Sequence, residues 1–139
     1  MALQTTVEHV DGPEPVTVLT LDGELDGAAF EGVIDTVRGM YDAGTRILVL
    51  DLTGLSFISS SGLVAVHAAM RLMRGEPAPD TEQGWVALRG LGQEADAGQV
   101  SNALRLFGVQ DAIQKVLDRT GLGPLIPTYP NRAAALAGR

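Results

Sequence analysis

One short run of residues constrains the fold more than any other feature of the sequence. Residues 47–50 read Ile-Leu-Val-Leu and are apolar without interruption, which is typical of a strand buried on both faces of a sheet. The stretch before this run has the apolar spacing of an amphipathic helix, carried by Phe30, Val33, Ile34, Val37 and Tyr41. A helix followed by a doubly buried strand favours a parallel sheet with crossover helices.

Other segments of the chain continue this alternation. Further strands are predicted at 3–10, 16–21, 102–109 and 125–129, where Pro127 confines the last strand to an edge. Asp22 and Gly23 are expected to end the second strand, and residues 51–58 to lead from the central strand into a serine-rich turn. The sequence therefore predicts a single α/β domain, with a mixed, mostly parallel sheet of about five strands and about four helices.

Capping residues mark where the helices begin and end. Helices are predicted from Gly27, from Leu63, over 111–119 and over 132–137. Asp26 and Asn131 are suited to start two of them, since a short polar side chain accepts hydrogen bonds from the first helical amides. Gly44 and Gly121 are suited to end two of them.

Composition excludes several classes of function. Seventeen acidic and ten basic residues give a net charge of −7, which repels phosphate backbones, so neither nucleic acid nor a membrane surface is expected as a partner. The 139 residues include no cysteine and two histidines, so we expect no disulfide, no metal site and no cofactor. The start of the chain has no basic region followed by an apolar run, which leads us to expect a cytoplasmic protein.

Three consecutive serines precede the helix predicted from Leu63. Serine is among the best N-cap residues, and either Ser59 or Ser60 could cap this helix. An anionic group at the start of this helix would lie near free backbone amides and the positive end of the helix dipole, which stabilise negative charge. Gly62 has no side chain, so another protein could approach Ser61 closely.

No residue pattern points to catalysis. The three serines lack the flanking glycines of a G-x-S-x-G nucleophile turn. Asp22, Glu24 and Asp26 could form a carboxylate site for acid–base chemistry or a cation, but a solvated loop with Asp26 as a cap is the better explanation. His67 has no second metal-ligating residue at a suitable spacing on its helix, and we expect it to have a packing or surface role.

Residues 51–63, Asp-Leu-Thr-Gly-Leu-Ser-Phe-Ile-Ser-Ser-Ser-Gly-Leu, resemble the signature of the STAS domain, the fold of bacterial anti-sigma factor antagonists. The family's pattern is a buried strand ending in Asp-Leu, a small loop, Phe-Ile-Asp-Ser-Ser-Gly-Leu and then a helix. This sequence departs from it at Ser59, which replaces the acidic residue. Residues 18–26 and 116–136 also resemble the family, so residues 77–100, which include Trp85, are expected to be an insertion.

The resemblance implies a binding module and not an enzyme. Members of this kind capture an anti-sigma factor that is itself a serine kinase; the kinase phosphorylates one serine to end the complex, and a serine phosphatase resets it. By position the phosphorylated residue is Ser61, with Ser60 or Ser59 as fallback sites. The expected partner-binding residues are Asp22, Glu24, Asp26, Ser59, Ser60, Ser61, Gly62 and Leu63.

Two other functions remain open at this stage. Ser59 in place of the acid favours a scaffold or signal-sensing subunit of a larger regulatory assembly that works without phosphorylation. A small-molecule-binding α/β domain that uses the serine turn as an anion site is the more distant alternative. In either case we expect a monomer or a weak dimer.

Overall fold

Six strands and four α-helices alternate along residues 2–76 and 102–138, the part of the chain that the computed structural model describes. The predicted insertion at 77–100 lies outside the described residues. The elements are β1 (Gln4–Val10), β2 (Val16–Leu25), α1 (Phe30–Asp42), β3 (Leu48–Asp51), β4 (Leu55–Ile58), α2 (Ser60–Met73), β5 (Leu104–Phe107), α5 (Asp111–Thr120), the 3-10 turn η2 (Gly123–Leu125), β6 (Thr128–Tyr129) and α6 (Arg132–Ala137). The prediction of one α/β fold with a mostly parallel mixed sheet is confirmed.

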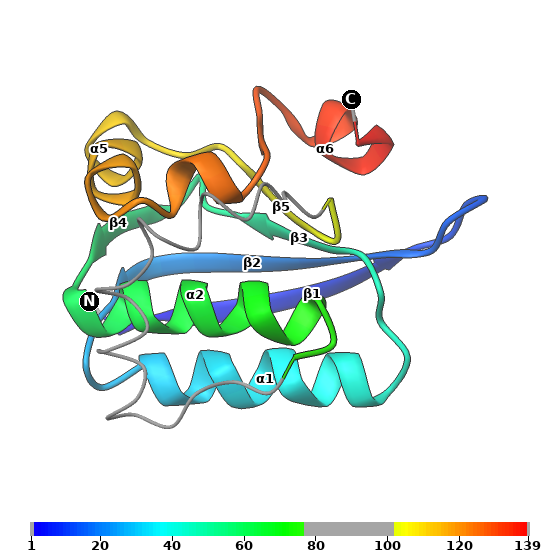
Figure 1. Cartoon of the computed structure of the whole chain (residues 1–139), viewed down its shortest axis with the longest axis horizontal. Coiled ribbons are helices and arrows are strands. Elements are labelled where there is room, and N and C mark those ends of the chain that lie inside the picture. The colour runs from blue at the N-terminus through cyan, green and yellow to red at the C-terminus, as the bar shows by residue number, and fades with distance from the viewer. Residues whose placement is uncertain (1, 77–101, 139) are drawn as a thin grey trace.

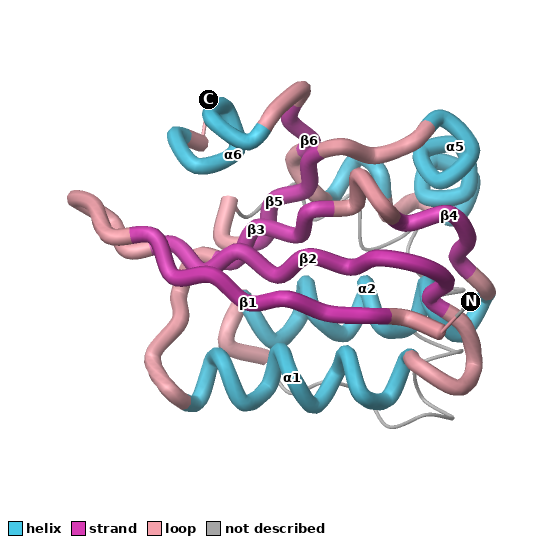
Figure 2. The backbone as a smooth tube through the Cα atoms, turned by 180° about the vertical axis from the view of Figure 1, so that it is seen from behind, coloured by secondary structure: helices cyan, strands magenta, loops and turns pink. Residues whose placement is uncertain are grey.

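The strands lie side by side in the order β1-β2-β3-β5-β6, and β4 pairs with the far end of β2 (Figure 2). Strand β1 runs antiparallel to β2, and every other pair is parallel. Strand β3 is in the middle of the sheet, and Leu48, Val49 and Leu50 are all buried, as the apolar run predicted. Strand β6 pairs only with β5, so the edge position predicted from Pro127 is also confirmed.

Alternate residues of the strands enter two apolar clusters on opposite faces of the sheet. Leu48 and Leu50 belong to the larger cluster, which includes residues of α1, α2 and α5. Val49 points to the other face and joins a smaller cluster with Ala135 of α6. Figure 1 shows α1 and α2 side by side on one face of the sheet and α6 on the other. None of the helices in the described ranges is long and apolar enough to cross a membrane.

Strand β2 is longer than the sequence predicted. Asp22 and Gly23 do not end it, because the backbone bends at Gly23, which has a φ of +111° that favours glycine, and then pairs with β4. The register shifts between Gly23 and Glu24 at this bulge. The prediction that residues 51–58 only connect two elements was therefore wrong, since Leu55–Ile58 is strand β4. The burial of β4 does not alternate, which removed the period-two signal.

Helix α2 also begins earlier than predicted, at Ser60 and not at Leu63. The last two predicted strands are shorter in the structure, because β5 covers Leu104–Phe107 and the 3-10 turn occupies Gly123–Leu125. Three of the capping predictions are confirmed: Asn131 accepts a hydrogen bond from Ala134 N, and Gly44 and Gly121 follow the ends of their helices. The helix start predicted at Gly27 with Asp26 as its cap was wrong, because α1 begins at Phe30 and its N-cap is Ala29. Asp26 instead accepts from Ala28 N and Ala29 N in the turn before the helix.

A buried arginine holds the last helix against the sheet. Arg105, in β5, is 6% exposed. Its Nε donates to the Asn102 carbonyl at 2.9 Å, and its Nη1 donates to the carbonyls of Ala135 at 2.8 Å and Leu136 at 3.2 Å. Helix α6 has six residues, too few to be stable alone. These charged hydrogen bonds therefore contribute much of its attachment.

We expect Arg105→Ala to lower the free energy of unfolding by about 2–3 kcal/mol, because it leaves buried carbonyl groups without donors. The measurement is urea denaturation followed by circular dichroism. Arg38→Ala is the control, since Arg38 forms only an exposed ion pair with Asp35, and should cost at most about 0.5 kcal/mol. Equal losses for the two variants would contradict the role of Arg105.

Candidate functional site

The serine turn lies where β4 ends and α2 begins, next to the end of β2. Ser59 connects all three elements. Its amide donates to the Leu25 carbonyl at 2.9 Å, and its carbonyl accepts from Leu63 N at 3.0 Å. Its Oγ accepts from Gly62 N at 3.1 Å. The sequence left the choice of capping residue open between Ser59 and Ser60, and the structure assigns the cap to Ser59.

Ser60 and Ser61 are the first two residues of α2 and differ in burial. Ser60 is exposed and Ser61 is half-buried. Ser59 accepts from the amides of Gly62 and Leu63, whereas no hydrogen bond within the described residues uses the amides of Ser60 or Ser61. The start of the helix therefore has backbone donors available at its positive end, an arrangement that favours a negatively charged group.

The loop between β2 and α1 faces this turn. A side-chain carbon built onto Gly27 would lie 3.8 Å from Ser61 Oγ. Asp26 shapes the loop, because its Oδ1 accepts from Ala28 N at 3.0 Å and Ala29 N at 3.2 Å. Gly27 could not be identified as part of the site from the sequence, because its contact with Ser61 joins a loop and a helix that are far apart in the chain.

Gly62 and Leu63 lie beneath the surface and not on it. A side-chain carbon on Gly62 would lie 2.5 Å from the Leu25 carbonyl oxygen and 2.7 Å from Ile58 Cγ1. The close approach of α2 to β2 therefore explains why position 62 is a glycine. This explanation does not require a partner to approach Ser61. Leu63 is 5% exposed and belongs to the main core.

The predicted acidic residues do not all gather at the serine turn. Asp26 is adjacent to Gly27, and Glu24 is half-buried and paired across the sheet with Phe57 of β4. Asp22 is exposed at the other end of β4, where it lies against Gly54. No group of three or more metal-ligating side chains occurs within residues 2–76 and 102–138.

The sequence missed one surface residue beside the turn. Phe57 is 48% exposed on β4, which pairs with β2 alone in the described sheet. It lies two residues before Ser59. Exposed aromatic side chains are common anchors of protein interfaces. Its position shortly before the three serines could have identified Phe57 as part of the site. Its exposure could not be predicted, because burial does not alternate along β4.

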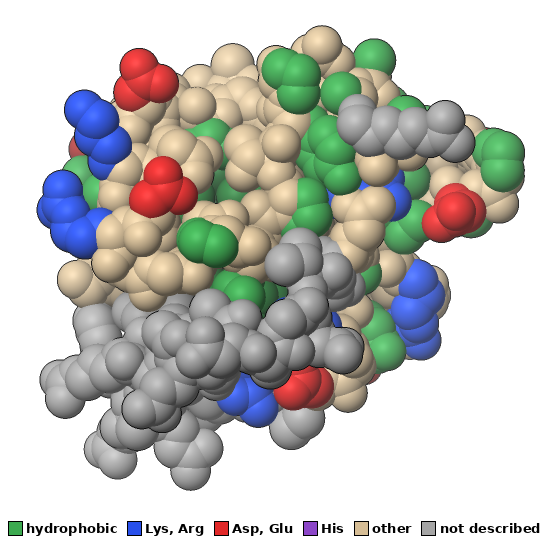
Figure 3. Space-filling view, turned by 45° about the horizontal axis from the view of Figure 1, so that its top comes forward, with side chains coloured by type: hydrophobic (Ala, Val, Ile, Leu, Met, Phe, Trp, Pro, Cys, Tyr) green, Lys and Arg blue, Asp and Glu red, His purple; other side chains and the backbone are tan. Residues whose placement is uncertain are grey.

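Two further points from the sequence concern His67 and the distribution of surface charge. His67 is fully buried in α2, so the packing role predicted for it is confirmed. Figure 3 shows acidic and basic side chains interspersed on the face that it presents. The described side chains of this face therefore form no continuous basic surface of the kind that follows a phosphate backbone.

Comparisons with protein families and solved structures show what this chain is similar to. The model of the STAS domain family matches residues 6–76, just over half of the chain. An anti-sigma factor antagonist from Mycobacterium paratuberculosis has 20% identity and a TM-score of 0.66, with 98% of this chain and 92% of that chain covered. The phosphorylated Bacillus cell fate determinant SpoIIAA has 22% identity and a TM-score of 0.57, with coverages of 96% and 100%.

A third similar structure is that of a variant of RsbS from Moorella thermoacetica, with 14% identity and a TM-score of 0.51; the match covers 94% of this chain and 92% of that chain. The comparison with curated proteins returns no match. Because the identities to these solved structures are low, their likeness concerns the fold. The roles of individual residues rest on the geometry above.

We expect Gly62→Ala to destabilise the protein by about 1–3 kcal/mol, because the added methyl group overlaps backbone and core atoms. Gly32→Ala is a matched control, since it also lies within a helix and has no atom within 4 Å of an added side-chain carbon. It should stabilise the protein by about 0.5–1 kcal/mol. Thermal unfolding by calorimetry compares the two, and equal melting temperatures would contradict the close packing of α2.

Ser59→Ala should lower the free energy of unfolding by about 1 kcal/mol, because it removes the side-chain cap of α2. Ser59→Asp should restore stability, since a carboxylate caps equally well and interacts favourably with the helix dipole. Chemical denaturation of both variants tests this role. Ser60→Ala is the control and should have little effect, because its exposed hydroxyl makes no capping bond in the described structure.

Proposed function

Because this chain belongs to the STAS domain family, we propose that it is an anti-sigma factor antagonist that binds an anti-sigma factor serine kinase and is released when Ser61 is phosphorylated. The observation that carries this proposal is the position of Ser61. It is the second residue of α2 and half-buried, and no hydrogen bond within residues 2–76 and 102–138 uses its amide or that of Ser60. The general role is also that of the structural neighbours whose fold this chain shares.

Several contacts favour Ser61 over the other two serines. Ser59 Oγ already accepts from Gly62 N, so a phosphate there would disturb the cap. Ser60 is exposed and remains the first fallback site. A side-chain carbon on Gly27 would lie only 3.8 Å from Ser61 Oγ. Because Gly27 has no side chain, the loop before α1 covers the Ser61 hydroxyl less than it would with a larger residue at this position.

A phosphate at this position would act on the surface and not on the fold. It would add about −1.5 to −2 charges at the turn that faces the loop of Asp26 and Gly27. The amide groups at the start of α2 would stabilise it within the folded protein. A partner that packs on Phe57 and the serine turn would meet this new charge, and repulsion together with the cost of desolvation would weaken the complex.

We propose regulated binding and not catalysis by this chain. No described hydrogen bond joins a serine hydroxyl of the turn to a histidine or a carboxylate that could activate it as a nucleophile. A serine phosphatase would reverse the modification, and the cytoplasm is where such kinases and phosphatases would meet this protein.

A second candidate is a scaffold or signal-sensing subunit that binds its partners without being phosphorylated. Ser59 favours it, because the family's acidic residue is absent there. The lost carboxylate would alter what a kinase recognises next to the hydroxyl. The two candidates differ in one observable, the transfer of phosphate.

The first experiment incubates the chain with the anti-sigma-type kinases of its source organism, ATP and magnesium, and maps any phosphate by mass spectrometry. We expect one phosphate on Ser61 and none on Ser61→Ala, which should still bind. Phosphate that persists on Ser61→Ala would move the site to Ser60 or Ser59. Binding without transfer would support the scaffold, and neither binding nor transfer would reject both candidates.

Ser61→Asp should weaken binding to the kinase by about tenfold or more, equivalent to about 1.4 kcal/mol, with the fold retained. Ala133→Asp is the matched control. It places the same charge at the second position of α6, on the opposite face of the sheet, and should bind as the unmodified chain does. Titration calorimetry measures both, and an unchanged affinity for Ser61→Asp would count against the switch.

A further inference from the structure

A pocket lies at the end of the sheet opposite the serine turn. Strands β2, β3, β4 and β5 are mutually parallel, and the serine turn is at their carboxyl ends. Residues just before β2, β3 and β5 line two adjoining cavities of about 200 and 420 Å³ at the amino ends. Four residues line both cavities: Glu14, Ile47, Arg105 and Ala137.

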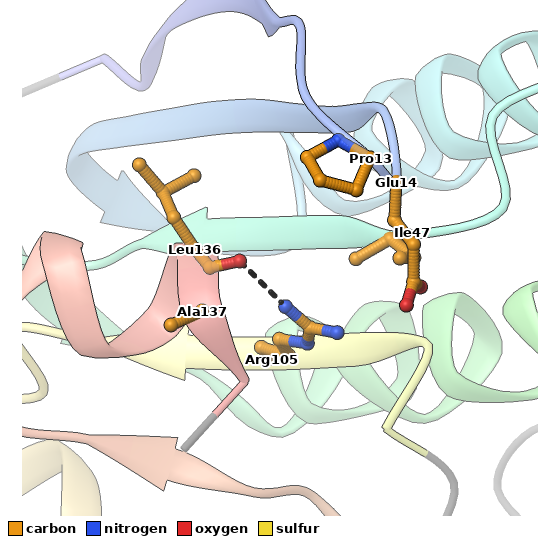
Figure 4. Close-up of a pocket in the computed structure, with 6 residues that line it drawn as sticks. All are labelled: Pro13, Glu14, Ile47, Arg105, Leu136 and Ala137. Atoms are coloured by element: carbon orange, nitrogen blue, oxygen red, sulfur yellow. Dashed lines mark hydrogen bonds between the residues drawn. The ribbon is translucent and has the colours of Figure 1, made fainter.

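Arg105 brings an unused hydrogen-bond donor to this pocket. The side chain is more than nine-tenths buried, and its Nε and Nη1 donate to backbone carbonyls. No hydrogen bond in the described part of the chain uses Nη2. Figure 4 shows the guanidinium group with α6 on one side and Glu14 reaching toward the same space from the other. Nη2 is not among the fully buried side-chain nitrogens of the described residues that have no partner, so an approaching group can reach this donor.

Asn102 supplies a second donor at the same place. Tyr129 Oη donates to Asn102 Oδ1 at 2.8 Å, which fixes the side-chain amide, and no hydrogen bond within the described residues uses its nitrogen. A side-chain carbon built onto Gly138 would lie 2.9 Å from Asn102 Nδ2 and 3.0 Å from Arg105 Nη2. Two donors from different elements therefore converge beside the small residue Gly138.

The charges around the pocket favour an anion. Arg46 lines the larger cavity, and it is held in place because its Nη1 donates to the Tyr41 carbonyl at 2.8 Å and the Thr45 carbonyl at 2.9 Å. Among the described residues, Glu14 is the one acidic side chain that lines either cavity. Two arginines and one glutamate leave a local excess of one positive charge, on a chain with a net charge of −7.

We propose that this pocket binds a small oxyanion, a carboxylate or phosphate group, through Arg105 Nη2 and Asn102 Nδ2. The cavity volumes suit a small molecule and not a macromolecule. Charged hydrogen bonds from a buried guanidinium group are strong enough to hold one oxygen of such a ligand. The site is separate from Ser61 and does not depend on the function proposed above.

The test is an NMR titration of the full chain with sodium phosphate or sodium acetate, against sodium chloride at the same ionic strength. We expect saturable shifts of the Asn102, Ala103 and Gly138 amides with at least one oxyanion. Saturation by phosphate alone would assign a phosphate group, and saturation by acetate alone would assign a carboxylate. Saturation by both would support an oxyanion site without that preference, and shifts that match those in chloride would overturn the proposal.

Two variants separate this site from an internal ion pair between Glu14 and Arg105. Glu14→Gln should tighten oxyanion binding by about two- to fivefold, because it removes a nearby negative charge, and should leave thermal stability unchanged. Asn102→Ala should weaken binding by about threefold or more, because it removes one donor. Glu31→Gln, in the first turn of α1, is the charge-matched control and should bind as the unmodified chain does.

Equal oxyanion affinity in the unmodified chain and in both pocket variants would overturn the proposal. So would a marked loss of stability in Glu14→Gln, since Glu14 would then be the internal partner of Arg105. Arg105 itself is not a suitable test position, because its replacement also loosens α6. Ser61→Asp should retain the titration, which keeps the outcome independent of the serine switch.

Discussion

The close contact between α2 and the end of β2 is the constraint on which the serine turn depends. The Leu25 carbonyl accepts from the Ser59 amide, and the same oxygen lies where a side chain on Gly62 would be. A helix can come this near to a strand only through glycine. The contact fixes the start of α2 against the sheet, so the serine hydroxyls have defined positions although they lie at the surface.

One of three neighbouring serines caps α2. Ser59 holds the helix start with its side chain, and within the described residues the hydroxyls of Ser60 and Ser61 make no capping bond. In the switch proposed above, a phosphate on Ser61 would change the surface while the cap remains. Phe57 adds an exposed apolar group beside this polar turn.

Much of the fold was predictable because it follows from local patterns. The apolar run at 47–50 located the central strand, and Gly44, Gly121 and Asn131 marked helix boundaries. Strand β4 was missed because its burial lacks alternation. Three further features could not be predicted from the sequence: the contact of Gly27 with Ser61, the internal role of Gly62 and the hydrogen-bond donors around Arg105. Each depends on contacts between segments far apart in the chain.

The choice of a neutral residue as the cap of α2 has a consequence for how the turn responds to its surroundings. A serine hydroxyl does not titrate in the physiological range, whereas an aspartate in the same position would carry a charge that acid removes. The capping side chain of α2 in this chain thus stays neutral from acidic to neutral conditions. A charge at position 59 would require a covalent change, because a change of pH in this range can neither add nor remove one.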